Sequence, residues 1–247
     1  MKIIKLYWYN LKMLLRSKEV LFWSIIFPPI MLIIMGTLFP YKGLGVEDER
    51  YIQFLTPGLI GLTIMMGSLT VTSARLVRYS QKGMLLRMSL TPLSATRFLI
   101  IEMVISMSLI FIQSIIVLLL GKIIFQIETA PLTQFIPAVI AGIIVFTSYG
   151  GAISGLTKTA EGVDVLANLI ATPMMFLCGV FFSTSQLPEK VKMFSEMLPL
   201  TQILYLLRNK TGVYNTKAIL VLTLWGILGI LLSIFAVKVN QRIIKRG

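Results

Sequence analysis

The sequence predicts an all-α integral membrane protein with six transmembrane helices. Of its 247 residues, 56% are hydrophobic and only 13% are charged, whereas a soluble domain usually carries about 25% charged residues. Six apolar stretches reach the roughly 20 residues that a helix needs to cross a bilayer. They are residues 20–39, 54–74, 98–120, 132–156, 165–183 and 218–237. We expect one transmembrane domain spanning residues 1–247, with a six-span bundle over residues 20–237.

Residues 1–18 are expected to form an amphipathic helix on the membrane surface. Apolar residues recur there at helical spacing, with Trp8 among them, and the lysines and Arg16 fall largely off that stripe. The alternative is a solvated helix that only precedes the first span. An aromatic residue beside a basic face favours the interfacial position.

The distribution of lysine and arginine predicts the orientation. With the N-terminus inside, 15 of these residues fall in inner segments and 8 in outer ones. Because positive residues accumulate on the cytoplasmic side, both termini are predicted to be cytoplasmic, with residues 238–247 as a basic tail. The predicted location is a plasma membrane, of bacterial type, crossed several times.

Prolines mark the first two spans. Pro28 and Pro29 remove two backbone donors, so a kink is expected there. Residues 56–58, Thr-Pro-Gly, predict a sharp entry into the second span. Met65 and Met66 follow as adaptable wall material for a substrate path, although methionine more often serves ordinary packing or lipid contact.

The fourth span carries Gly151 and Gly155, a pair that lets two helices approach closely. Packing within the chain and contact with another subunit are equally compatible with it. The following loop, residues 157–164, is expected to be cytoplasmic and to offer a small second contact surface.

The fifth span is expected to be broken at Pro173, because interrupted membrane helices line protein or a cavity rather than lipid. The segment after it, residues 184–216, is half apolar and interrupted by prolines. It predicts short helices that dip into the outer leaflet between the fifth and sixth spans.

Several classes of chemistry are excluded by the residues that are missing. The chain has no histidine, its one cysteine is Cys178, and no phosphate-binding loop occurs. We therefore expect no catalytic site, no metal site and no cofactor in this chain. We also expect no nucleic-acid partner, because the basic residues lie between apolar runs and not together on one polar face. Glu102 is the one acid within a predicted span. Its shallow depth favours a structural or docking role over a proton relay.

Residues 81–97, QKGMLLRMSLTPLSATR, form a basic segment between the second and third spans, which we call the coupling segment. Its apolar residues Met84, Leu85 and Leu86 give a helical face that can insert into a partner's groove. Arg87 can bond to a partner carboxylate. The alternative is a solvated loop whose arginines only set the topology.

Three patches, in order, carry a resemblance to a known family. The first is residues 56–58, and the second is residues 81–94 with Thr-Pro-Leu at 91–93. The third begins with Leu-Cys-Gly-Val at 177–180 and continues through Leu187-Pro188, Pro199-Leu200 and Arg208. Together they resemble the permease subunits of ATP-binding cassette (ABC) exporters of the second type. The chain departs from that pattern at Gln81, where glutamate is common, and at Gln202.

The resemblance implies a pair of permeases, as a homodimer or a heterodimer, in membrane lipid above two separate ATP-binding subunits that hold ATP and magnesium. It implies an ATPase-coupling interface at Gln81, Lys82, Gly83, Met84, Leu85, Leu86, Arg87, Thr91, Pro92 and Glu102. It also implies a translocation path, for which we name Met65, Met66, Pro173, Phe176, Phe181 and Phe182.

The sequence thus predicts a permease that exports an amphipathic or hydrophobic substrate, such as a drug, an antibiotic, a peptide or a lipid-like compound. The apolar character of the named path residues favours such cargo over sugar. The main alternative is a membrane scaffold or sensor subunit that partners an ATPase without transporting anything. A secondary transporter is disfavoured by the scarcity of intramembrane charge, and a membrane enzyme by the lack of a catalytic constellation.

Overall fold

The computed structural model describes residues 26–39, 50–81, 95–209 and 215–244, with backbone alone at residues 79–80, 95–102 and 237–244. Within these ranges the regular structure is helical throughout. The predicted surface helix at residues 1–18 and most of the coupling segment lie outside the described residues.

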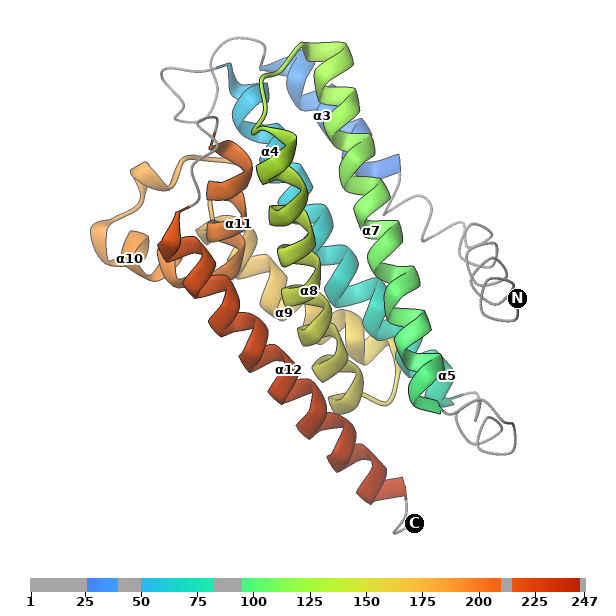
Figure 1. Ribbon diagram of the computed structural model, residues 1–247. Coiled ribbons are helices and arrows are strands. Elements are labelled where there is room, and N and C mark those ends of the chain that lie inside the picture. Colours follow the sequence, from blue (N-terminus) through green and yellow to red (C-terminus); the bar gives the residue numbers. More distant parts are fainter. Residues whose placement is uncertain (1–25, 40–49, 82–94, 210–214, 245–247) are drawn as a thin grey trace.

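Six helices make up the bulk of the molecule, and one of them continues through a π-helical turn (Figure 1). They are α3 (Phe27–Leu38), α4 (Tyr51–Met66) with η2 (Gly67–Thr72) and α5 (Ser73–Gln81), α7 (Ala95–Phe125), α8 (Leu132–Leu156), α9 (Ala160–Leu177) and α12 (Thr216–Ile244). Three short helices, η3 (Thr184–Gln186), α10 (Glu189–Met197) and α11 (Pro199–Arg208), connect α9 to α12.

Five helical stretches in the described residues are long and apolar enough to cross a membrane: Tyr51–Arg78, Met103–Phe125, Leu132–Leu156, Ala160–Leu177 and Thr216–Ala236. The first predicted span is represented by the shorter apolar helix α3, because residues 20–25 lie outside the described part. The all-helical membrane architecture is confirmed, and a sixth complete crossing stays a prediction.

The bundle has two distinct ends (Figure 1). The end of α5, the turn between α8 and α9, and the C-terminal end of α12 lie at one end, whereas α10, α11 and the start of α4 lie toward the other. This arrangement matches the predicted alternation of inner and outer segments. Which end faces the cytoplasm stays a prediction.

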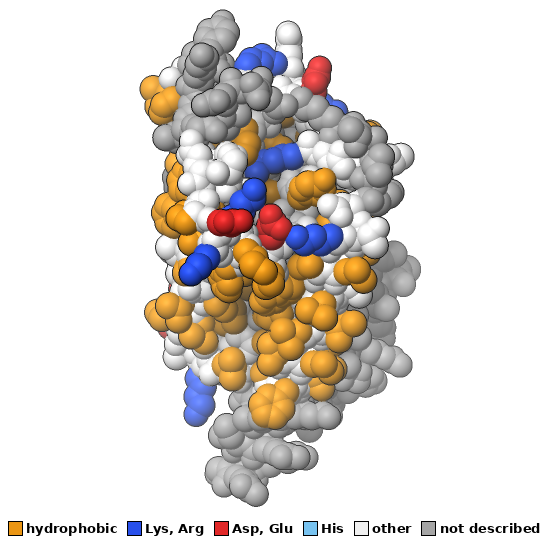
Figure 2. All heavy atoms as spheres, turned by 90° about the vertical axis from the view of Figure 1, so that its left-hand side faces the viewer, with side chains coloured by type: hydrophobic (Ala, Val, Ile, Leu, Met, Phe, Trp, Pro, Cys, Tyr) orange, Lys and Arg blue, Asp and Glu red, His pale blue; other side chains and the backbone are white. Residues whose placement is uncertain are grey.

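Helices α4 and α8 form the centre of the bundle. Tyr51, Leu59 and Ile64 on α4 and Phe135 and Phe146 on α8 are almost completely buried. By contrast, α12 leaves most of its apolar side chains exposed, and α9 exposes several, among them Val165, Leu169 and Phe176. Figure 2 shows such a surface, with hydrophobic side chains gathered below a group of charged ones. An apolar exterior of this kind is suited to lipid.

The paired glycines of α8 serve packing within the chain. A Cβ atom on Gly151 would lie 2.5 Å from the Oγ atom of Ser233, and one on Gly155 would lie 2.6 Å from the Cβ atom of Ala236. Both contacts are with α12, so small residues on the two helices let their backbones approach closely. Of the two roles open for this pair, the described contacts support the intrachain one.

The fifth predicted span differs from the helix that the structure shows. Helix α9 begins at Ala160, where Thr159 caps it by accepting a hydrogen bond from the Gly162 amide at 3.1 Å. It passes through Pro173 without a break and ends at Leu177. The predicted break at Pro173 is therefore wrong, and the helix stops instead before Gly179, whose φ of +75° suits glycine.

The segment after α9 forms short helices, as predicted. Helix α11 is deeply buried through Leu200, Ile203 and Leu207. The C-terminal end of α10 is joined to α12 by a hydrogen bond and an ion pair. The Nε1 atom of Trp225 donates to the Met197 carbonyl at 2.8 Å, and Lys217 pairs with Glu196 at 2.6 Å. How deeply these helices enter a leaflet stays a prediction.

Candidate functional site

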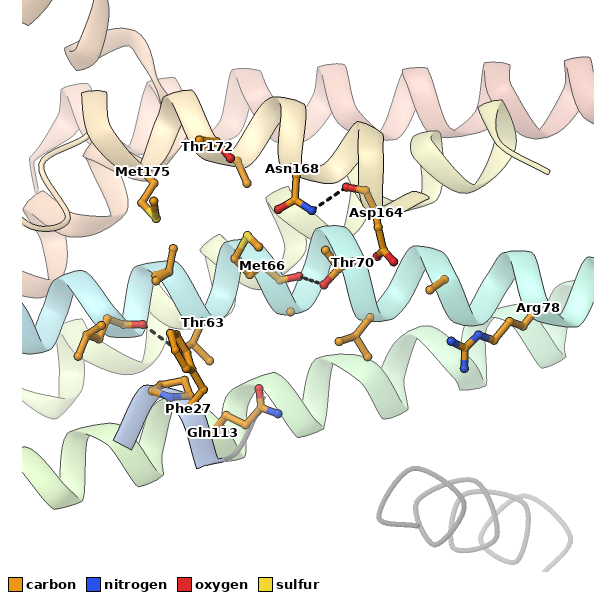
Figure 3. A pocket seen from close by; sticks show the side chains of 17 residues that line it. Phe27, Thr63, Met66, Thr70, Arg78, Gln113, Asp164, Asn168, Thr172 and Met175 are labelled. Atoms are coloured by element: carbon orange, nitrogen blue, oxygen red, sulfur yellow. Dashed lines mark hydrogen bonds between the residues drawn. The ribbon is translucent and has the colours of Figure 1, made fainter. Parts of the chain in front are cut away.

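A cavity of about 560 Å³ lies between α3, the α4–η2–α5 helix, α7 and α9. Its lining is mainly apolar, with Leu59, Leu62 and Met175 among the side chains that form it. Arg78 and Asp164 line the cavity where α5 passes the start of α9, giving that region one positive and one negative side chain (Figure 3). The cavity thus has a mainly apolar wall, and its polar side chains come from the α4–η2–α5 helix, α7 and α9.

The α4–η2–α5 helix lines the cavity where its winding changes. The π-helical segment η2 includes Gly67, Thr70 and Val71, which all line the cavity. A Cβ atom on Gly67 would lie 3.0 Å from the side chain of Ile110 on α7, so glycine allows α7 to pack closely here. Single π-helical turns inside longer helices occur frequently at functional sites.

Helix α9 presents a polar stripe to the same cavity. Asp164, Asn168 and Thr172 are spaced four residues apart, which places them on one helix face, and all three line the cavity. Figure 3 shows Asp164 and Asn168 directed from α9 toward the α4–η2–α5 helix. Polar side chains within a membrane helix normally face protein or water rather than lipid, so we expect this face of α9, which adjoins the buried face of Val163, Ala167 and Ala171, to face away from lipid.

The N-terminal end of α4 is hydrogen-bonded to the turn that follows α9, both directly and through Arg208 of α11. The hydroxyl of Tyr51 donates to the Phe181 carbonyl at 3.1 Å. The guanidinium of Arg208 donates to the carbonyls of Gly179 at 2.7 Å and Phe54 at 3.1 Å, and stacks over the Phe54 ring at 3.6 Å. These contacts lie before Leu59 on α4 and after Met175 on α9, beyond the cavity-lining residues of both helices at that end.

At the opposite end of the cavity, a hydrogen bond joins the last residue of α5 to the turn that precedes α9. The Nε2 atom of Gln81 donates to the backbone carbonyl of Lys158 at 2.8 Å. Gln81 is the last residue of α5, and Lys158 lies in the three-residue turn between α8 and α9. The predicted loop at residues 157–164 is therefore shorter than expected, because α9 takes up most of it.

The structure brings one of the predicted path residues to the cavity. Met66 lines it, whereas Met65 is fully buried in the core. Pro173, Phe176, Phe181 and Phe182 are not among the residues that line it. Phe176 is about half exposed and stacks on Phe182, with ring centroids 6.2 Å apart. A transport role for these residues stays a prediction.

Most of the predicted coupling residues lie outside the described part of the chain. Gln81 is described, and Glu102 has a backbone position on α7 but no described side chain. The remaining residues that the sequence assigned to this interface fall in the range 82–94. Their contact with an ATPase stays a prediction.

The polar lining of the cavity is not among the features predicted from the sequence. Thr63 and Thr70 on the second span, Gln113 on α7, and Asn168 and Thr172 on α9 all line the cavity. The signal available was the four-residue spacing of Asp164, Asn168 and Thr172, together with a glutamine in the middle of an apolar stretch. Neither pattern indicates by itself which other helix it faces.

Comparison with known proteins gives two results. The model of the ABC-2 type transporter family matches residues 1–210. Nodulation protein J of Bradyrhizobium diazoefficiens is 27% identical over 168 residues, which cover 66% of this chain and 63% of that protein. The similarity thus spans less than two thirds of the relative's length.

The family match covers most of the chain, including every helix that lines the cavity, and it confirms the resemblance seen in the three sequence patches. The chain belongs to the ABC-2 type transporter family and is a multi-pass membrane permease of that family.

Proposed function

We propose that the chain is the permease subunit of an ATP-driven exporter and that the cavity between α3, α4–η2–α5, α7 and α9 is its part of the translocation path. The polar stripe of Asp164, Asn168 and Thr172 carries this proposal. In lipid the Asp164 carboxylate and the remaining polar groups of Asn168 and Thr172 would lack hydrogen-bond partners, whereas a hydrated path supplies them. The mixed lining suits an amphipathic or hydrophobic substrate.

A second permease, identical or paralogous, would complete the path. Helix α9 exposes Val165, Leu169 and Phe176 beside the polar stripe, and it is one of the least buried long helices described. A partner copy packed on this side would cover apolar surface of α9 and enclose the cavity. We expect the two permeases to sit above two ATP-binding subunits in a cell membrane.

The coupling segment is our proposed contact with the ATP-binding subunit. It leaves α5 at Gln81, directly after the helix that lines the cavity. Force applied there would reach α4 through a continuous helix and α9 through the bond from Gln81 to Lys158. We expect Met84→Asp or Leu85→Asp to abolish co-purification of the ATP-binding subunit while membrane insertion stays intact, because a charge would be buried in the contact.

Transport itself can be tested with the chain and its co-purifying ATP-binding protein in lipid vesicles, using uptake of a fluorescent amphiphile into inverted vesicles. We expect ATP-dependent uptake that falls severalfold in the Asn168→Leu and Thr172→Val variants. Thr223→Val is the matched control, because Thr223 is an exposed threonine on α12 whose hydroxyl bonds to the Ile219 carbonyl. Uptake by the chain alone, or equal loss in the control, would contradict the proposal. If the ATPase rate of the complex is the same with and without each amphiphile, the alternative of a non-transporting scaffold subunit would be favoured.

A further inference from the structure

The side chain of Gln113 lines the cavity and carries a buried amide oxygen that has no hydrogen-bond donor among the described residues. Gln113 lies on α7 and is 6% exposed, and its Oε1 atom accepts no hydrogen bond from the described residues. This oxygen lies 3.9 Å from the position of a Cβ atom on Gly67, so it faces the π-helical segment (Figure 3). Burying a polar atom without a partner is unfavourable, and more so among membrane helices.

The threonines nearby have already used their hydrogen-bond donors. The hydroxyl of Thr63 donates to the Leu59 carbonyl at 2.8 Å, and that of Thr70 donates to the Met66 carbonyl at 2.5 Å. A hydroxyl that donates its one proton still has lone pairs that can accept. Both threonines line the cavity, so they present acceptors to it.

Asn168 extends the same pattern across the cavity. Its Nδ2 atom donates to the Asp164 carbonyl at 2.8 Å, within its own helix. Its Oδ1 atom and the Asp164 carboxylate are acceptors. A glutamine amide can turn to present either its oxygen or its nitrogen, so the neighbouring threonines and Asn168 decide which kind of ligand group fits.

We propose that Gln113, Thr63 and Thr70 form a subsite for a ligand that donates hydrogen bonds through neutral hydroxyl or N–H groups on an apolar body. The apolar body would lie against Leu59, Leu62 and Met66, and the donors would satisfy Gln113 and the two threonine oxygens. The inference rests on the proposed function and specifies the substrate class for the same path.

The test uses the full chain in lipid nanodiscs and two photoreactive probes. One is an alkyl glucoside with a diazirine in its alkyl chain, and the other is its fully O-methylated counterpart, which keeps the acceptors but has no donors. Labelling is mapped by mass spectrometry of the peptides that contain residues 59–78, 105–117 and 164–175. At equal concentration in the bilayer, we expect the glucoside to label these peptides about fivefold more than the methylated probe, the ratio for one neutral hydrogen bond.

Two sets of variants decide the outcome. We expect Gln113→Leu and the Thr63→Val, Thr70→Val double variant to abolish the preference for the glucoside, and Thr223→Val on α12 to keep it. Gln113→Leu should also melt at an equal or higher temperature than the wild type, because it removes an unpartnered buried amide. A lower melting temperature would mean that Gln113 has a structural partner, and would overturn the inference.

The other outcomes separate the inference from the proposed function. Equal labelling of the cavity by both probes in the wild type would overturn the subsite while leaving the path in place. A preference that survives in the Gln113 and threonine variants would do the same. Labelling of lipid-facing peptides alone, with none in the cavity by either probe, would contradict the path itself and the subsite with it.

Discussion

The side-chain amide of Gln81 donates a hydrogen bond to the backbone carbonyl of Lys158 at 2.8 Å. It joins the last residue of α5 to the turn that leads into α9, so the two helices that carry most of the cavity lining are connected at the end where the coupling segment begins. At their other end they are connected by several bonds through Tyr51 and Arg208.

Removing the Gln81 bond should loosen the start of α9. We expect Gln81→Leu to raise amide hydrogen exchange at residues 159–163 about fivefold, because a neutral hydrogen bond contributes about 1 kcal/mol. Hydrogen-exchange mass spectrometry in nanodiscs measures this. Lys158→Ala is the matched control, because the acceptor is a backbone carbonyl that alanine retains. Equal exchange in Gln81→Leu and the wild type would show that the bond does not hold α9.

The contact between α4 and the turn after α9 should tolerate no extra atoms at Gly58. A Cβ atom there would overlap the backbone carbonyl oxygen of Val180. We expect Gly58→Ala to lower stability by about 1–3 kcal/mol through overpacking, measured as a lower melting temperature in detergent. Gly226→Ala is the control, because its Cβ atom would meet the nearest atom at 3.7 Å. A melting temperature unchanged by Gly58→Ala would place the two segments farther apart.

The pair formed by Glu196 and Lys217 makes a pH-dependent link between α10 and α12. The hydrogen bond and charge of Lys217 lower the pKa of Glu196 below its ordinary value of 4.5. A lowered carboxyl pKa contributes stability above the ordinary pKa, and that contribution is lost as the pH falls through the folded-state pKa. We expect carboxyl titration by NMR to show the lowered value, and Lys217→Gln to return it toward 4.5.

The same pair should add little to overall stability. Both side chains are well exposed, at 59% for Lys217 and 41% for Glu196, and exposed pairs contribute about 0–1 kcal/mol. The link from Trp225 to Met197 should therefore keep α10 in place when the pair is broken. A large drop in melting temperature for Lys217→Gln at neutral pH would contradict this assignment.

Cys178 should be inert toward thiol reagents in the folded protein. It is 1% exposed, and burial raises the pKa of its thiol to about 11, although hydrogen bonds with Thr201 act in the opposite direction. Because the thiolate is the reactive form, we expect no labelling by a water-soluble maleimide at pH 7.5 until the protein is denatured. A cysteine placed at the exposed Gln186, in a Cys178→Ser background, should label readily. Rapid labelling of Cys178 itself would show that the turn opens.

The sequence by itself determined that the chain lies in membrane lipid and that its fold is all-helical. Apolar runs of about 20 residues have few other uses, so the spans at 54–74, 98–120, 132–156 and 218–237 fall on helices with small shifts of their ends. The three ordered patches also indicated the family, but only the one that begins at 177–180 marks a helix end. The predicted sharp entry at residues 56–58 is wrong, because α4 begins at Tyr51 and continues through Pro57.

Only the tertiary structure decided which residues meet. Pro173 predicted a break, yet α9 continues through it, because a membrane helix can accommodate the missing amide where neighbours or local adjustments compensate. Phe176, Phe181 and Phe182 were chosen for their apolar character, whereas the cavity takes its polar lining from Thr63, Gln113 and Asn168. Hydropathy measures how strongly a side chain avoids water, and it does not record which face of which helix that side chain will meet.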